Sequence, residues 1–82
     1  MPYFVYMLQC EDGSFYTGYT RNVKRRVKLH VMGKGARYTQ MHRPTNLVHI
    51  ERFTSRSEAM RREKKVKRMS HARKAGLMDS KT

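Results

Sequence analysis

The alternation of side chains over the first twenty residues predicts a β-hairpin. Residues 3–10 are apolar at both sets of alternating positions, which is typical of a strand covered on both faces. Residues 14–20 form a second aromatic strand that pairs back onto the first. A two-residue Asp12-Gly13 turn would place Tyr6 and Tyr16 on opposite faces, whereas a three-residue loop that includes Glu11 would place them on the same face. The pattern leaves both turns open.

The rest of the chain contains two helical patterns and one extended pattern. Asn22 is a candidate N-cap for a helix to about Met32, where Gly33 and Gly35 end it. Residues 34–46 form a polar, basic connector, and residues 47–53 alternate as a third strand. The S-x-x-E sequence at 55–58 predicts a capping box before a long helix to about Met69, and Ser70 can cap one further short helix. The predicted element order is β-β-α-β-α-(α).

Length and composition predict one domain in a reducing compartment. The chain has 82 residues, of which we assign 1–78 to a single domain and 79–82 to a mobile tail. A single Cys10 excludes an internal disulfide, and the histidines are too scattered for a zinc site. The longest apolar run, residues 3–8, is too short to span a membrane and is not preceded by a secretory signal. We therefore expect a cytoplasmic protein that does not interact with membranes.

The charge distribution favours a nucleic-acid partner. Nineteen Lys and Arg against six Asp and Glu give a net charge of +13. Between Asp12 and Glu51 there is no acidic residue, and neither basic segment has the broad apolar face of an interfacial helix. The basic residues of that interval are Arg21, Lys24, Arg25, Arg26, Lys28, Lys34, Arg37 and Arg43. Binding should weaken with salt, with a log-log slope of roughly −0.9 per phosphate contacted on duplex DNA.

Two helices carry candidate catalytic side chains at inward positions. Helical spacing places Arg26 and His30 on the same stripe as Val23, Val27 and Val31. The alternative is a histidine satisfied by the backbone and an arginine whose stem extends to solvent.

The second long helix places one acidic residue, Glu63, at its inner face. Glu63 lies four residues after Ala59 and three before Val66, which with Met69 define the inner face of that helix. The alternative role of Glu63 is a surface pair with Lys67.

These residue types match the requirements of phosphodiester hydrolysis. A tyrosine hydroxyl can take the proton of the attacking water if neighbouring cations lower its pKa. Arg26 can clamp the phosphate, and Glu63 can hold one Mg²⁺ whose remaining ligands are water. Tyr3, Tyr6, Tyr16 and Tyr19 are otherwise ordinary core or stacking residues.

The chain resembles the GIY-YIG nuclease superfamily. Val5-Tyr6-Met7 stands in place of the first triplet and Tyr16-Thr17-Gly18 in place of the second, so that Gly-Ile is absent before Tyr6 and threonine replaces isoleucine. Residues 35–39, 57–59 and 62–64 look like the small stand-alone bacterial subgroup, which is also similar to the nuclease domain of structure-specific flap and junction endonucleases. The resemblance implies an α+β domain with a three-stranded antiparallel sheet flanked by helices.

The resemblance also implies roles for single residues. Tyr6 and Tyr16 match the motif tyrosines, with Tyr6 favoured as general base and Tyr16 orienting water or phosphate; Gly18 matches the motif glycine. Arg26 matches the catalytic arginine, His30 a histidine that assists proton transfer, and Glu63 the ligand of a single Mg²⁺ or Mn²⁺. Arg37 and Tyr38 would border the DNA groove. No appended DNA-recognition domain is evident, so we expect a monomer that cuts DNA without sequence specificity and selects branched or damaged DNA by shape or through a partner protein.

Two functional hypotheses follow. The first is a metal-dependent DNA endonuclease. The second is a non-catalytic DNA- or RNA-binding module, whose aromatic strands would stack on unpaired bases.

Overall fold

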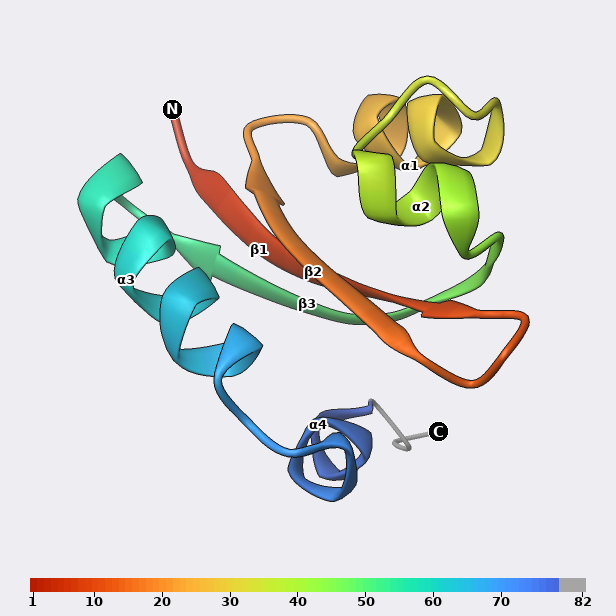
Figure 1. Cartoon of the computed structure of the whole chain (residues 1–82). Coiled ribbons are helices and arrows are strands. Elements are labelled where there is room, and N and C mark those ends of the chain that lie inside the picture. Colours follow the sequence, from red (N-terminus) through yellow and green to blue (C-terminus); the bar gives the residue numbers. More distant parts are fainter. Residues whose placement is uncertain (79–82) are drawn as a thin grey trace.

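A computed structural model describes residues 1–78, so the predicted mobile tail at 79–82 lies outside the described residues. None of the helices in the described part is long and apolar enough to cross a membrane. The elements follow the order β-β-α-α-β-α-α along the chain (Figure 1). Their bounds are β1 Tyr3–Cys10, β2 Phe15–Thr20, α1 Val23–Val31, α2 Arg37–Met41, β3 Pro44–Phe53, α3 Arg56–Lys67 and α4 His71–Leu77.

The hairpin between β1 and β2 has a three-residue loop. Tyr6 pairs with Gly18 and Leu8 with Tyr16, so Tyr6 and Tyr16 lie on the same face of the sheet. The amide of Gly13 donates to the carbonyl of Cys10, and Gly13 has a φ of 84°, a left-handed conformation that glycine adopts without strain. Of the two turns that the sequence leaves open, the structure has the one that brings the tyrosines together.

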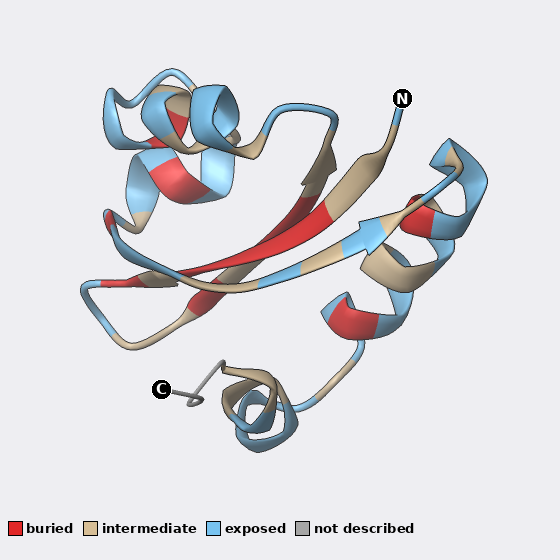
Figure 2. Cartoon of the chain, turned by 180° about the vertical axis from the view of Figure 1, so that it is seen from behind, coloured by how far each residue is buried: buried red, intermediate tan, exposed pale blue. Residues whose placement is uncertain are grey.

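The three strands form an antiparallel sheet in the order β2-β1-β3, with helices on both faces. Helices α1 and α2 lie on one face, and α3 and α4 lie on the other (Figure 1). Consecutive residues of β1 show this division, because Tyr6 contacts His30 of α1 while Met7 packs against Val66 of α3. The buried residues concentrate along the middle of β1 (Figure 2), as predicted for a strand covered on both sides.

Side-chain caps begin the helices where the sequence predicts them. The Asn22 carboxamide oxygen accepts from the amide of Arg25, the Ser55 hydroxyl from that of Glu58, and the Ser70 hydroxyl from that of Arg73. The predicted inner face of α3 is also confirmed, since Ala59 and Val66 are buried and Met69 is half-buried.

The connector at 34–46 differs from its prediction. It contains the short helix α2, and β3 begins at Pro44 instead of Leu47 because Pro44 pairs with Cys10 and the Thr45 hydroxyl bonds the carbonyl of Gln9. A five-residue helix is too short to show a helical period. Proline is acceptable at this place because it is the first residue of an edge strand.

A half-buried ion pair attaches α3 to the sheet. The Glu51 carboxylate of β3 accepts two hydrogen bonds from Arg62 of α3, at 2.8 and 2.9 Å, and a third contact from His49 at 2.6 Å. Burial alone would raise the pKa of Glu51, but the bonds from Arg62 and His49 outweigh it and lower the pKa. The pair fixes the helix that carries Glu63.

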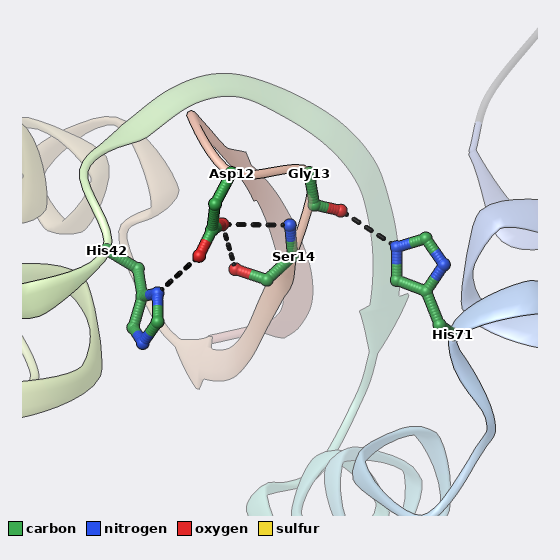
Figure 3. A network of polar contacts seen from close by, with 5 residues as sticks. All are labelled: Asp12, Gly13, Ser14, His42 and His71. Carbon is green, nitrogen blue, oxygen red and sulfur yellow. Dashed lines mark hydrogen bonds and ion pairs between the residues drawn. The ribbon is translucent and has the colours of Figure 1, made fainter.

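Two histidines anchor the hairpin loop (Figure 3). The Asp12 carboxylate accepts from the amide and hydroxyl of Ser14 and, at 2.6 Å, from Nδ1 of His42. On the other side of the loop, Nε2 of His71 donates to the carbonyl of Gly13 at 2.8 Å. The loop is thereby attached to the segment after α2 and to the start of α4.

Candidate active site

Two tyrosines and a histidine from three elements meet on one face of the sheet. The Tyr6 hydroxyl lies 2.7 Å from Nε2 of His30, and both side chains are buried. The Tyr16 ring lies 4.9 Å from the His30 ring and 6.2 Å from the Tyr6 ring, between centroids. The three-residue hairpin loop is the reason that both phenols face α1.

The motif glycine leaves the space that Tyr6 occupies. A Cβ atom at Gly18 would lie 2.7 Å from the Tyr6 hydroxyl and 2.9 Å from Cζ of the same ring. Gly18 pairs directly with Tyr6 in the sheet, and its φ is not positive. Glycine is therefore needed here for room, not for backbone conformation.

Burial determines the ionisation of Tyr6. Desolvation raises the pKa of Tyr6 well above its ordinary value of 10.0; the neighbouring Tyr16 and the charge of Glu63 raise it further, and Arg26 opposes them. A net lowering of the pKa of the tyrosine base by nearby cations is therefore not found for Tyr6, because burial outweighs the effect of Arg26. Its hydroxyl is neutral in the free protein.

The inner stripe of α1 is narrower than predicted. His30 is buried, and Val23 and Val27 are half-buried, but Val31 is 59% exposed. Arg26 is also exposed, so its predicted place on the packed side is wrong. In a helix this short, residues at the flanks of the stripe reach past the edge of the sheet. Burial, followed by the charge of Arg26, lowers the pKa of His30 from its ordinary value of 6.5.

One cavity is lined by five of the predicted active-site residues. It has a volume of about 680 Å³ and lies beside β2, the edge strand that is next to β1. Tyr6, Tyr16, Gly18, Arg26 and Glu63 all line it. Its other lining residues are Tyr3, Tyr19, Thr20, Arg21, Asn22, Arg25, Leu29 and Arg56. The lining residues come from β1, β2, α1 and α3 and from the segments beside them, so the cavity joins residues from both faces of the sheet.

Glu63 is the acid of this cavity. Its side chain is 17% exposed, and one carboxylate oxygen lies 3.4 Å from Nζ of Lys67. The predicted pair with Lys67 is present along the helix, and Glu63 also lines the cavity.

The donor set fits a hard divalent cation with one protein ligand. Within residues 1–78 no group of three or more His, Cys, Asp or Glu side chains is placed to hold a metal. Mg²⁺ is commonly bound through one or two carboxylates, with water and substrate phosphates as its remaining ligands. The half-buried Glu63 carboxylate shares its cavity with the exposed guanidinium of Arg26. This arrangement suits an ion held by one carboxylate, not an ion enclosed by several protein ligands.

The predicted nucleic-acid-binding residues are all exposed. Arg25 lines the cavity, and the others lie elsewhere on α1, on α2 and in the flanking loops. These residues are Lys24, Lys28, Lys34, Arg37, Tyr38 and Arg43. The structure contains nothing that tests their contacts with nucleic acid.

A row of rings extends from the cavity. The Tyr38 ring lies 6.1 Å from that of Tyr16 and is stacked on His42 at 4.2 Å. Tyr38 is 36% exposed, and His42 is fixed by its contact with Asp12. The row offers aromatic surface beside the cavity.

Several site residues have no role in the sequence-based hypothesis. Arg21 lies 5.4 Å over the Tyr3 ring, and Nε of Arg56 lies 3.3 Å from the Tyr19 hydroxyl, and both pairs line the cavity. The Thr39 hydroxyl forms a hydrogen bond with Nδ1 of His30. Gly35 and Thr39 belong to the sequence that carries the family resemblance, which is the one signal that points to them.

Comparison with known proteins agrees with this fold. The family model of the GIY-YIG catalytic domain matches residues 2–75. A UPF0213 protein of Natronomonas pharaonis is 50% identical over 80 residues, which cover 98% of this chain and 94% of the relative. A UPF0213 protein of Staphylococcus haemolyticus is 48% identical over 77 residues, with 94% of each chain covered.

Solved structures of similar proteins have the same architecture. The solution NMR structure of a UPF0213 protein from Bacillus halodurans has a TM-score of 0.59 and 51% identity, and the match covers 94% of this chain and 82% of that one. An NMR structure of a protein from E. faecalis has a TM-score of 0.62 and 39% identity over 90% of this chain and 79% of that one. The chain belongs to the GIY-YIG catalytic-domain family, a family of nucleases.

Proposed function

We propose that the protein is a metal-dependent endonuclease that hydrolyses phosphodiester bonds in DNA. The observation that carries the proposal is that Tyr6, Tyr16, Arg26 and Glu63 line one cavity. A nucleophile activator, a cation for phosphate and a carboxylate for a metal are the groups that this reaction needs within reach of one phosphorus atom. Family membership makes nuclease activity the expected chemistry.

Tyr6 and His30 would move the proton of the attacking water. Because its pKa is raised, Tyr6 starts as a neutral hydroxyl and takes a proton from water only if it gives up its own. Nε2 of His30, 2.7 Å away, is the available acceptor, and a lowered pKa keeps the imidazole neutral. The water proton passes to the phenol oxygen as the phenol proton passes to Nε2, so that His30 ends as imidazolium.

Arg26 and Tyr16 would position the scissile phosphate. The guanidinium of Arg26 is exposed at the cavity and, within residues 1–78, forms no ion pair, so it is available for two phosphate oxygens. The Tyr16 ring is near both Tyr6 and His30 and lines the same cavity, where its phenol could orient water or phosphate.

Glu63 would hold the one Mg²⁺ or Mn²⁺ ion. When bound, such an ion supplies positive charge to the phosphate and to the leaving oxygen. Nζ of Lys67 lies 3.4 Å from this carboxylate, so a cation held by Glu63 would replace the lysine as its charged partner.

The row of rings favours DNA with unpaired bases beside the cut. Tyr16, Tyr38 and His42 present aromatic surface next to the cavity, and stacking contributes about 1–3 kcal/mol per base. This arrangement supports the proposal that the protein selects branched, flap or damaged DNA by shape, and a partner protein would be a second source of specificity. All catalytic groups come from one chain, so the monomer is the expected active form.

The test is cleavage of nicked, flap, forked and four-way DNA in Mg²⁺ or Mn²⁺. Glu63→Gln and Arg26→Ala should abolish cutting while binding persists. Glu58→Gln, at the cap of the same helix, and Arg61→Ala, exposed on α3, are matched controls that should cut normally. Cutting retained in Glu63→Gln and Arg26→Ala would contradict the site. Tight binding with no cutting of any substrate would favour the non-catalytic DNA- or RNA-binding module.

A further inference from the structure

The ring of His30 is held at both of its nitrogens. Nε2 lies 2.7 Å from the Tyr6 hydroxyl, and Nδ1 lies 2.7 Å from Oγ1 of Thr39. His30 is 1% exposed and Thr39 is 2% exposed, so water does not replace either contact. A neutral imidazole carries one proton, and the tautomer therefore decides whether Nε2 can accept from Tyr6.

A third contact, between Thr39 and Ala36, indicates which atom donates in each hydrogen bond. Oγ1 of Thr39 lies 2.8 Å from the carbonyl of Ala36, and a carbonyl only accepts. Thr39 has one hydroxyl proton. If it were donated to Nδ1, two acceptor oxygens would face each other at 2.8 Å. The bonds are satisfied when Thr39 donates to Ala36 and His30 donates from Nδ1 to Thr39.

We propose that Thr39 is a positioning residue that fixes the Nδ1–H tautomer of His30, so that Nε2 stays an acceptor facing the Tyr6 hydroxyl. This inference rests on the proposed nuclease mechanism for its consequence in catalysis. Thr39 does not touch substrate. It acts through His30, as the outer hydrogen-bond partner of a functional histidine commonly does.

Gly35 makes the contact between α2 and His30 possible. A Cβ atom at Gly35 would collide with Nδ1, Cγ and Cε1 of His30. The φ of Gly35 is not positive, so the backbone does not require glycine there. The missing side chain allows the turn before α2 to lie against the ring, which brings Thr39 to Nδ1.

Nδ1 of His30 has a second neighbour, the backbone amide of Ala36, which determines what we expect when the threonine hydroxyl is removed. The amide of Ala36 lies 3.4 Å from Nδ1, which is longer than a normal N–H···N contact. With valine at position 39 this amide becomes the remaining partner of Nδ1. It favours the opposite tautomer, in which Nε2 carries the proton and no longer accepts from Tyr6.

The tautomer can be measured directly by ¹⁵N NMR of the histidine side chains in the full chain. We expect wild-type His30 to carry its proton on Nδ1, and Thr39→Ser to keep that tautomer. Thr39→Val should shift His30 toward the Nε2–H form. An Nε2–H tautomer in the wild type, or an unchanged tautomer in folded Thr39→Val, would overturn the proposal. These spectra do not depend on cleavage, so they are informative even if the proposed nuclease activity fails.

Cleavage assays give the functional consequence and a control. Thr39→Val should lower the cleavage rate by about 10- to 100-fold, by analogy with the loss when the outer hydrogen-bond partner of a metal-binding histidine is removed. Thr39→Ser should retain most activity. Thr17→Val is the matched control, because Thr17 is also 2% exposed but its hydroxyl has no hydrogen-bond partner within residues 1–78. Equal losses in Thr39→Val and Thr17→Val would assign the effect to packing and reject positioning.

Discussion

Arg26 and Glu63 line the same cavity although their helices pack on opposite faces of the sheet. The sheet has only three strands, with β2 at its edge, and the cavity that both side chains line also includes Tyr16, Gly18 and Tyr19 of β2. Both charges act on the buried hydroxyl of Tyr6, where Arg26 lowers its pKa and Glu63 raises it. A phosphate on Arg26 and a cation on Glu63 would therefore be neighbours.

Gly18→Ala should damage both stability and cleavage. The added methyl group would lie 2.7 Å from the Tyr6 hydroxyl, and overpacking of this kind costs about 1–3 kcal/mol. The free energy of unfolding in urea and the cleavage rate measure the two effects. Gly76→Ala is the control, because nothing lies within 4 Å of that position in α4, and alanine should stabilise the helix by roughly 0.5–1 kcal/mol. Unchanged stability in Gly18→Ala would show that Tyr6 has more room than its contacts indicate.

The cleavage rate should vary with pH in proportion to the fraction of His30 that is neutral. Its pKa is lowered from 6.5, so cleavage should be flat near neutral pH and fall only as the pH drops below 6.5 and His30 gains a proton. The unfolded chain takes up that proton first, so the free energy of unfolding should fall in the same direction.

An NMR titration of His30 in the free protein tests the cause of this shift. Arg26→Gln removes a charge that lowers the pKa of His30, so its midpoint should rise relative to the wild type. A wild-type midpoint at or above 6.5 would contradict the assignment of His30 as acceptor.

Arg62→Met should loosen α3 from the sheet. The substitution removes two hydrogen bonds to the half-buried Glu51 carboxylate, and we expect a loss of about 1–2 kcal/mol in the free energy of unfolding, less than for a fully buried pair. Urea unfolding of Arg62→Met beside Arg61→Met, which removes an exposed neighbour, isolates the ion pair. Equal stability of the two variants would show that the pair contributes nothing.

Salt dependence should show which basic residues bind the phosphates. The double change Lys24→Ala and Lys28→Ala on α1 should reduce the log-log salt slope of duplex binding by roughly 0.9 for each phosphate that the variant no longer neutralises. Lys64→Ala with Lys65→Ala removes the same charge from the exposed side of α3 and should change the slope less. Equal slopes in the two double variants would indicate that net charge attracts the DNA and that no particular set of basic residues contacts its phosphates.

Local chemistry explains what the sequence predicted well. Alternating apolar residues define β1, and Asn22, Ser55 and Ser70 cap their helices through bonds to amides a few residues away. The inner stripe of α3 follows from helical spacing. Each of these features depends on residues close together in the chain, so a linear pattern contains the needed information.

Tertiary structure decided the features that make a site. The hairpin register placed Tyr6 and Tyr16 on one face, Thr39 reached His30 through a helix too short to predict, and burial reversed the expected pKa shift of Tyr6. The sequence alone determined which residues could take part, because their types and spacing are local. Which of them meet, and in which protonation state, depended on loop register and desolvation, and these arise only when distant segments pack together.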